Sequence, residues 1–254
     1  MTEPACTPEG SAAVASSAVV REWGRRVHAE YRSAAITHHL TLWLIQLGAA
    51  PDVLEEGLRI VADELAHAEL SHAVHVEAGG PPLPPLPREL LGLTRVKGEP
   101  LEAAIARAAV EVFCLGETVA VPLFKELRAP CVVGSARRAF DRILRDEVRH
   151  REFGWRVLDD LLALPCADEV CALVVRELPA RFGRLRRSYA PEVEGGVPEV
   201  IEADAAWGLM PMGNYARVLG ATLEREYVPW FAARGIDARA AWHDATALIE
   251  RRSG

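Results

Sequence analysis

The amino-acid sequence predicts an all-α protein, a bundle of four long helices with additional helices at its C-terminal end. Three observations predict this class. Ala, Leu, Arg and Glu, which favour helices, are abundant, whereas aromatic residues make up only 6% of the chain. Four long stretches without clustered Gly and Pro are separated by turn-forming segments. No useful length of sequence alternates between apolar and polar residues with the period of a β-strand.

The first two predicted helices form a hairpin. One runs over about residues 18–47 and ends at Gly48, and the next begins at Pro51 and runs over about residues 51–78. Proline suits the first turn of a helix because its missing N–H would have no partner there. Residues 79–87 cannot be helical because they are rich in proline, and this loop continues to about Gly98.

The next two predicted helices form a second hairpin, at about residues 100–127 and 136–164, with a turn at residues 130–134. Short turns make the helices of each hairpin antiparallel, and the long loop joins the hairpins as a crossover does in a helical bundle. After Pro165 we expect shorter helices at about residues 168–188, 198–207, 212–233 and 237–252.

These elements divide the chain into a disordered tail at residues 1–17, the bundle at residues 18–164, and C-terminal helices at residues 165–254 that pack on it. The tail lacks the basic start and apolar run of a signal peptide, so we expect a cytoplasmic protein. The net charge of −7 argues against a nucleic-acid partner. No apolar run approaches the roughly 18 residues that span a bilayer, so we expect no membrane partner.

Two of the predicted helices carry the same pattern of Asp, Glu, His and Glu. One Glu-x-x-His is weak evidence in a chain so rich in Glu, but two extended copies on the second helix of each hairpin are a stronger signal. Residues three apart share a helix face, so each Glu-His pair can bind one metal ion. With a Glu from each remaining helix, this arrangement predicts a carboxylate-bridged dimetal site. The two copies are Asp63, Glu64, His67 and Glu69, and Asp146, Glu147, His150 and Glu152.

Glu117 is the predicted ligand of the third helix. It lies about 14 residues before the turn centre near Cys131, and Glu147 lies about 15 residues after it, so both should lie at the same height. Its helix face is otherwise apolar, where an unpartnered carboxylate would be costly. Glu111 lies about 8 Å away along the helix, on a face that includes Arg107, and we expect it to be a solvated surface residue.

The first helix offers Glu30 or His38 as its ligand. Glu64 lies about 15 residues beyond the turn centre near Ala50, whereas Glu30 lies about 20 residues before it and misses that height by about one turn. Glu22 misses the height by about three turns, and His38 misses it by less than one turn on the other side. We expect Glu30 to be the ligand and keep His38 as the alternative.

Asp63 and Asp146 are expected to orient the ligand histidines. Each directly precedes the Glu of its motif and lies four residues before the His. A histidine that binds a metal usually donates its second ring N–H to a carboxylate or carbonyl. We therefore expect these aspartates to contact His67 and His150, within one helix or across two.

Three segments at residues 30–34, 114–120 and 146–155 resemble the ferritin-like diiron superfamily, and more closely its bacterial ferritin-like domain proteins. The resemblance implies two iron ions, with manganese or a mixed manganese and iron pair as alternatives. A radical tyrosine of the ribonucleotide reductase subunit has its counterpart in Ser71 here, so a tyrosyl radical is not expected. The implied ligands are Glu30, Glu64, His67, Glu117, Glu147 and His150.

The leading functional hypothesis is a diiron oxidase or oxygenase that takes O₂, an electron donor and a small or carrier-bound organic substrate. Oxygen and nitrogen ligands suit iron or manganese better than softer metals. We expect no catalytic residues apart from the dimetal centre, and a homodimer is considered. The alternatives are a non-enzymatic iron- or manganese-binding protein and a helical interaction module. A basic cluster is expected to pair with a helix dipole or, alternatively, to contact an anionic substrate or carrier; it comprises Arg181, Arg184, Arg186 and Arg187.

Overall fold

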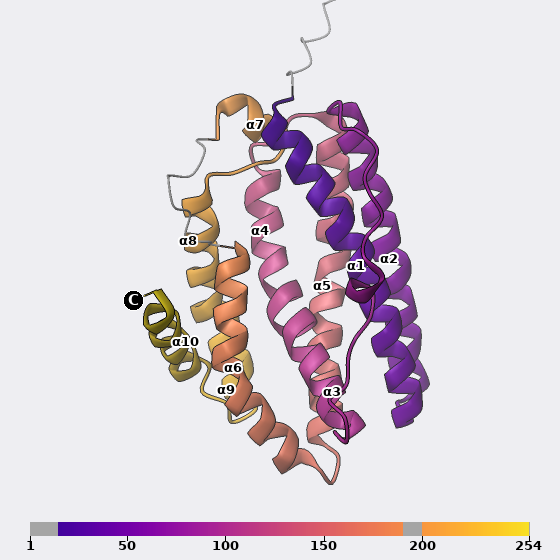
Figure 1. The fold of residues 1–254 in the computed structure, drawn as a ribbon, viewed down its shortest axis with the longest axis vertical. Helices are drawn as coiled ribbons and strands as arrows, with labels where there is room; N and C mark the ends of the chain where they lie inside the picture. Colours follow the sequence, from indigo (N-terminus) through magenta and orange to yellow (C-terminus); the bar gives the residue numbers. More distant parts are fainter. Residues whose placement is uncertain (1–14, 190–199, 254) are drawn as a thin grey trace, which may run out of the picture.

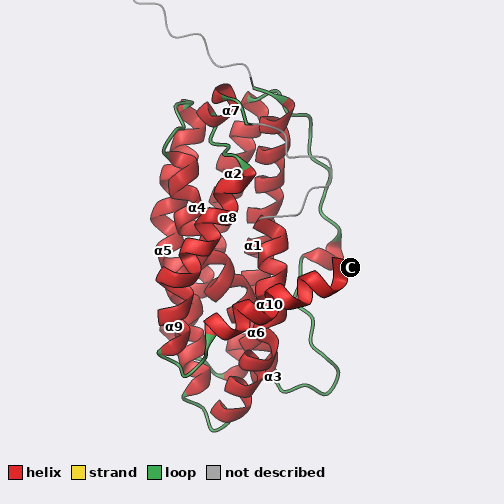
Figure 2. Cartoon of the chain, turned by 90° about the vertical axis from the view of Figure 1, so that its left-hand side faces the viewer, coloured by secondary structure: helices red, strands yellow, loops and turns green. Residues whose placement is uncertain are grey.

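The computed structural model describes residues 15–189 and 200–253, and within these ranges every regular element is a helix (Figure 2). The all-α expectation is thereby confirmed. The tail expectation falls largely on residues 1–14, which lie outside the described ranges, and Ser17 is already the first residue of a helix. None of the described helices is long and apolar enough to cross a membrane.

The first hairpin consists of α1 (Ser17–Leu47) and α2 (Pro51–Glu77), close to the predicted bounds. The hydroxyl of Ser16 accepts a hydrogen bond from the N–H of Val19 at 3.3 Å, which caps the first turn of α1. Gly48 ends α1 with a φ of 80°, a left-handed conformation that glycine adopts without steric cost. A sharp turn follows, and α1 and α2 run antiparallel in Figure 1.

The loop between α2 and α3 is held against the first hairpin by histidines. It contains one short 3₁₀ helix, η1 (Arg88–Leu90). The Nδ1 atom of His39 accepts a hydrogen bond from the N–H of Leu93 at 3.0 Å, and His75 Nε2 lies 2.9 Å from the carbonyl oxygen of Pro81. These contacts give the irregular loop backbone the polar partners that a helix would otherwise supply.

The third long helical segment is interrupted by a π-helix. It consists of α3 (Leu101–Ala108), the π-helical η2 (Ala109–Glu117) and α4 (Thr118–Arg128), and it pairs with α5 (Gly134–Leu162). The expectation of a regular helix was wrong over η2, where hydrogen bonds span five residues instead of four. Such segments are uncommon and occur frequently at functional sites. The four long helical segments lie side by side in Figure 1.

The C-terminal helices are α6 (Ala167–Tyr189), α7 (Glu202–Ala206), α8 (Met212–Thr222), the π-helical η3 (Leu223–Tyr227), α9 (Val228–Ala232) and α10 (Ala238–Ser253). They pack mainly beside the second hairpin, where α8 contacts α4, and α6 contacts α3, η2 and α5. Aromatic rings supply much of this contact: Trp155 of α5 stacks on Trp230 of α9 with ring centroids 5.2 Å apart.

The η2 segment is fixed in place from two sides. A Cβ atom at Gly154 of α5 would lie 2.1 Å from the Cβ of Phe113, so glycine allows α5 to approach η2 closely. On another side, the hydroxyl of Tyr227 in η3 donates a hydrogen bond to the carbonyl oxygen of Leu115 at 2.6 Å. A π-turn changes the hydrogen-bond pattern of its helix, and Tyr227 supplies a partner to one of its carbonyls.

Candidate metal centre

The six side chains predicted as ligands lie together between the four long helical segments. Ligand atoms of Glu30, Glu64 and His67 all lie within 4.8 Å of one another, and so do those of Glu64, Glu117 and His150. Glu64 is common to both groups. The two imidazole rings face the same space, with centroids 5.7 Å apart. The structure therefore brings one carboxylate from each of α1 and η2 to the two Glu-His pairs of α2 and α5.

His67 is fully buried and directs one ring nitrogen into this cluster. Its Nδ1 lies 3.6 Å from Glu64 Oε2, 3.9 Å from Glu147 Oε1 and 4.0 Å from Glu30 Oε2. The other ring nitrogen, Nε2, lies 3.2 Å from Asp146 Oδ2, within hydrogen-bond distance. One nitrogen thus faces the carboxylates while the other is oriented by an aspartate of the opposite helix.

His150 repeats this arrangement from the side of α5. Its Nδ1 lies 3.4 Å from Glu64 Oε1 and 3.7 Å from Glu147 Oε2, and its Nε2 lies 3.5 Å from Asp63 Oδ2. Each aspartate therefore faces the histidine of the other helix, which is the crossed form of the expected contact. Glu147 lies between the two imidazoles, as Glu64 does, so both carboxylates face both halves of the cluster.

Two arginines hold the aspartates in these positions. Arg142 bonds Asp63 Oδ1 at 2.9 Å and also bonds Asp146, while Arg149 bonds Asp63 and lies 3.6 Å from Asp146 Oδ1. All four side chains come from α2 and α5. Their charges balance, so the outer side of the cluster is a neutral, hydrogen-bonded layer that joins the two helices.

Several polar atoms that face the cluster have no hydrogen-bond partner among the described residues. They are buried, and leaving such atoms unpaired costs about 1–3 kcal/mol each. Two cations, one in each of the two groups of converging ligand atoms, would give all of these atoms a partner. The residues thus fit a metal site, since oxygen and neutral nitrogen donors converge where protein partners are missing. These atoms are Glu64 Oε2, Glu147 Oε2, His67 Nδ1 and His150 Nδ1.

The carboxylates of the cluster repel one another. Burial, and then the charge of Glu64, raises the pKa of Glu30 well above its usual range, and burial with the charge of Glu117 does the same for the pKa of Glu147. Burial and the charge of Glu64 also raise the pKa of Glu117. Positive charge at the centre would stabilise the ionised form of each carboxylate.

The pKa values of Glu64 and His150 shift as those of a charged pair. Burial opposes the ionised form of Glu64, but its contacts with His150 and then His67 outweigh burial and lower its pKa. Burial also opposes the charged form of His150, but Asp63 and Glu64 outweigh it and raise its pKa to about 10. Without a metal ion, a proton on this imidazole therefore supplies part of the positive charge.

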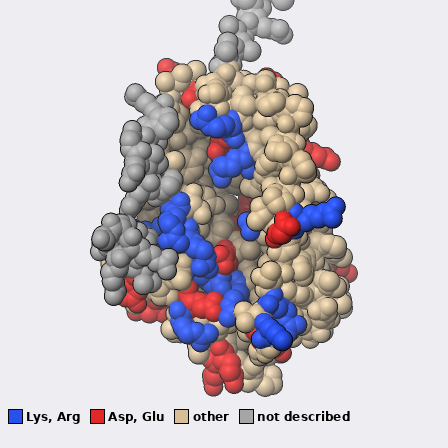
Figure 3. Space-filling model, in the orientation of Figure 1, with Lys and Arg blue, Asp and Glu red and all other residues tan. Residues whose placement is uncertain are grey.

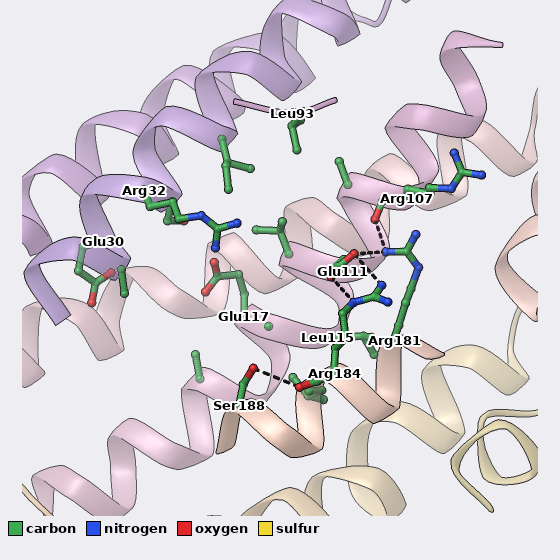
Figure 4. A pocket seen from close by; sticks show the side chains of 18 of the residues that line it. Glu30, Arg32, Leu93, Arg107, Glu111, Leu115, Glu117, Arg181, Arg184 and Ser188 are labelled. Atoms are coloured by element: carbon green, nitrogen blue, oxygen red, sulfur yellow. Dashed lines mark hydrogen bonds and ion pairs between the residues drawn. The ribbon is translucent and has the colours of Figure 1, made fainter. Parts of the chain in front are cut away.

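A cavity of about 610 Å³, which the sequence did not predict, connects the cluster with the surface. Glu30, Glu117 and Glu147 line its inner part, and arginines that include the exposed Arg32 and Arg184 line its outer part. Figure 4 shows Glu30 and Glu117 together with these arginines. The space-filling view shows a hollow in this face of the protein, bordered by basic side chains (Figure 3). Pockets of roughly 300–1,000 Å³ are typical of small-molecule sites.

Two choices made from the sequence can be compared with the structure. His38, the alternative to Glu30, is exposed, whereas Glu30 is 8% exposed and faces His67. Glu111 is 46% exposed at its side chain, but it is ion-paired with Arg181 and Arg184 and lines the cavity. Those two arginines thus contact a carboxylate of η2, which the helix-dipole expectation did not include.

Not every position of the repeated motif faces the cluster. Glu69 and Glu152, the last residues of the repeated pattern, are exposed on the outer surfaces of α2 and α5 and take no part in the cluster. The remaining positions of both copies meet at the cluster.

Comparisons of the chain with protein-family models, with curated proteins and with solved structures found no match.

Proposed function

We propose that this chain is a ferritin-like dimetal-carboxylate protein that binds two iron ions and acts as an O₂-dependent oxidase or oxygenase on an organic substrate. Manganese, or one ion of each metal, is the alternative occupant. The observation that carries the proposal is the set of four unpaired, buried polar atoms that converge between α2 and α5, beside a cavity that reaches the surface.

The ligand set divides into two equivalent halves. Glu30 and His67 would hold one ion, and Glu117 and His150 would hold the other, because each pair belongs to one of the two groups of converging ligand atoms. Glu64 and Glu147 face both imidazoles and would contact both ions. Four carboxylates balance the charge of two divalent ions, so the loaded site would carry no large net charge in the protein interior.

The residues around the cluster orient the side chains that would bind the metal ions. Asp146 and Asp63 orient the imidazoles so that Nδ1 faces inward, and the two arginines behind them balance the aspartate charges. Ser33 donates a hydrogen bond to Glu64 Oε1 at 2.8 Å and so orients this carboxylate. When bound, the metal ions would supply the sites for O₂ and the electrons for its reduction, which protein side chains cannot provide.

The cavity favours an enzyme over a protein that only binds metal. It is large enough for an organic molecule, and apolar side chains such as Ile36, Leu93 and Leu115 form part of its wall. It reaches Glu30, Glu117 and Glu147, so a molecule inside it would lie beside the metal ions. An electron donor is expected to restore the reduced metal after each turnover.

The proposal is tested by measuring metal content and O₂ consumption in the same protein sample. Protein reconstituted with Fe²⁺ under anaerobic conditions is expected to hold about two ions per chain and to consume O₂ when mixed with aerated buffer. Glu69→Gln and Glu152→Gln are matched controls, because they remove exposed carboxylates from the same motifs. Less than half an ion per chain would contradict the metal site. Full loading without O₂ consumption would leave a metal-binding protein and contradict the oxidase.

A further inference from the structure

The arginines at the outer part of the cavity are not all balanced by carboxylates. Among the described residues, five arginines line the cavity, and four of them form ion pairs. Arg32 forms no ion pair with a described residue. Its Nε donates a hydrogen bond to the carbonyl oxygen of Leu90 at 3.1 Å, which leaves the other side of the guanidinium available. The paired arginines are Arg25, Arg107, Arg181 and Arg184.

The position of Arg32 directs its charge into the cavity. Arg25, Ala29, Arg32 and Ile36 follow one another at intervals of four, three and four, so they share one face of α1, and all four line the cavity. In Figure 4 the guanidinium of Arg32 points away from the α1 backbone into the space that also holds Glu117. An arginine in this position can bind two oxygens of an anionic group at once.

The inner part of the cavity has the opposite charge. Glu30, Glu117 and Glu147 lie there, and even two divalent metal ions would only balance the carboxylates of the cluster. An anionic group is therefore more favourable beside Arg32 than beside the cluster. Ile36, Val112 and Leu115 also line the cavity and offer an apolar wall to the rest of a ligand.

From this distribution of charge we infer that the cavity binds an organic anion, a molecule with an apolar body and a carboxylate or phosphate group. Arg32 binds the anionic group at the outer end, and the apolar body extends inward along α1 and η2 towards the metal cluster. The inference rests on the proposed function, for which it names the substrate class. It also assigns Arg32 as the residue that determines specificity for the charged group.

Calorimetric titration of the manganese-loaded chain with four octyl compounds tests this inference. Octanoate, octyl phosphate, octanol and octylamine share the same apolar body and differ only in the head group. We expect one or both anions to bind at least about tenfold more tightly than octanol, the difference that a charge-assisted hydrogen-bond pair contributes. The stronger of the two anions identifies the preferred head group. Equal binding of octanol and both anions, or no binding of any compound, would overturn the inference.

Three variants separate the charge of Arg32 from its contact with the loop. Arg32→Gln should weaken anion binding about tenfold and leave octanol binding unchanged. Arg32→Lys should keep part of the anion preference, because it retains the charge but loses the fork that binds two oxygens at once. Arg21→Gln removes an exposed arginine of the same helix outside the cavity and should change nothing. If Arg32→Gln weakens octanol binding as much as anion binding, the loop contact accounts for the loss and the charge assignment is overturned.

Metal content measured on the same samples distinguishes this inference from the proposed function. Full metal loading without anion preference would overturn the inference and leave the dimetal proposal intact. Anion preference in a chain that binds no metal would overturn the dimetal proposal and leave the binding site intact.

Discussion

The two sides of the cluster are built differently, because both copies of the sequence motif lie on the same side. The side formed by α2 and α5 carries both histidines, both aspartates and the arginines that balance them, all within regular α-helices. The side formed by α1 and η2 contributes one carboxylate each, Glu30 and Glu117, and it borders the cavity. No residue of α2 lines that cavity, and α5 contributes only Glu147.

Because of this difference, the two sides of the cluster are suited to different roles. The α2–α5 side is closed by hydrogen bonds and suited to holding metal ions, while the α1–η2 side is open and suited to admitting a ligand. The π-helical segment lies on the open side, and five of its nine residues line the cavity: Glu111, Val112, Leu115, Gly116 and Glu117. We therefore expect changes on one side to leave the role of the other side intact.

The largest effect is expected on the closed side, from His67→Ala and His150→Ala. Each variant should lose at least one of about two metal ions, because no other described nitrogen ligand is near that half of the cluster. Helical content should persist, since apolar packing and not metal supplies most of the stability. Metal analysis combined with circular dichroism measures both. Two fully occupied sites in either variant would contradict the ligand assignment.

A smaller effect is expected when the aspartates behind the histidines lose their charge. Asp146→Asn and Asp63→Asn should each weaken metal affinity about 10–100-fold, the usual result when the partner of a metal-bound histidine is changed. A competition titration against a chromophoric chelator gives the affinities, with Glu152→Gln as the control. Unchanged affinity in both variants would show that the crossed contacts do not support the imidazoles.

On the open side, Glu117→Ala and Glu111→Ala should behave differently. Glu117 is grouped with Glu64 and His150, so its loss should alter the optical or Mössbauer signature of the iron-loaded protein. Glu111 bonds Arg181 and Arg184 instead, so its loss should leave that signature unchanged. The reverse outcome, with the signature lost only in Glu111→Ala, would mean that η2 is rotated so that Glu111, and not Glu117, faces the cluster.

The smallest effect concerns pH and involves both sides. The raised pKa values of Glu30, Glu117, Glu147 and His150 mean that these groups keep protons which a metal ion must displace. Protons therefore compete with metal at low pH, and the rise in Tm on adding Mn²⁺ should grow between about pH 5 and pH 7.5. Thermal unfolding with and without Mn²⁺ across this range measures the rise. A rise in Tm that is independent of pH would contradict the inference that the metal-free cluster holds protons which the metal displaces.

Much of the closed side could be predicted from the sequence, and less of the open side. The repeated motif marked α2 and α5 because ligand spacing and helix period coincide there, and counting along the helices placed Glu117 beside Glu147. Counting residues from the turn predicted the height of Glu30 only to within about one helical turn, because this method treats the two helices of a hairpin as symmetric about their turn. The π-helix was not predicted, because a change from four to five residues per hydrogen bond has no clear signal in amino-acid composition.

The cavity and the role of Arg32 could not be predicted because they depend on tertiary contacts. The basic cluster at Arg181 and Arg184 was visible in the sequence, but its carboxylate partner Glu111 lies on another helix, about 70 residues away. Arg32 is distinguished only by the absence of such a partner among the described residues, which no local pattern reveals. The need for glycine at position 154 likewise follows only from the close approach of Phe113.

The central claim is most directly tested by a crystal structure of the iron-loaded protein with anomalous diffraction data collected at the iron absorption edge. We expect two anomalous peaks between α2 and α5, one beside Glu30 and His67 and the other beside Glu117 and His150, with Glu64 and Glu147 near both. An iron-soaked crystal without peaks in this cluster, or with iron bound only elsewhere on the protein, would contradict the claim.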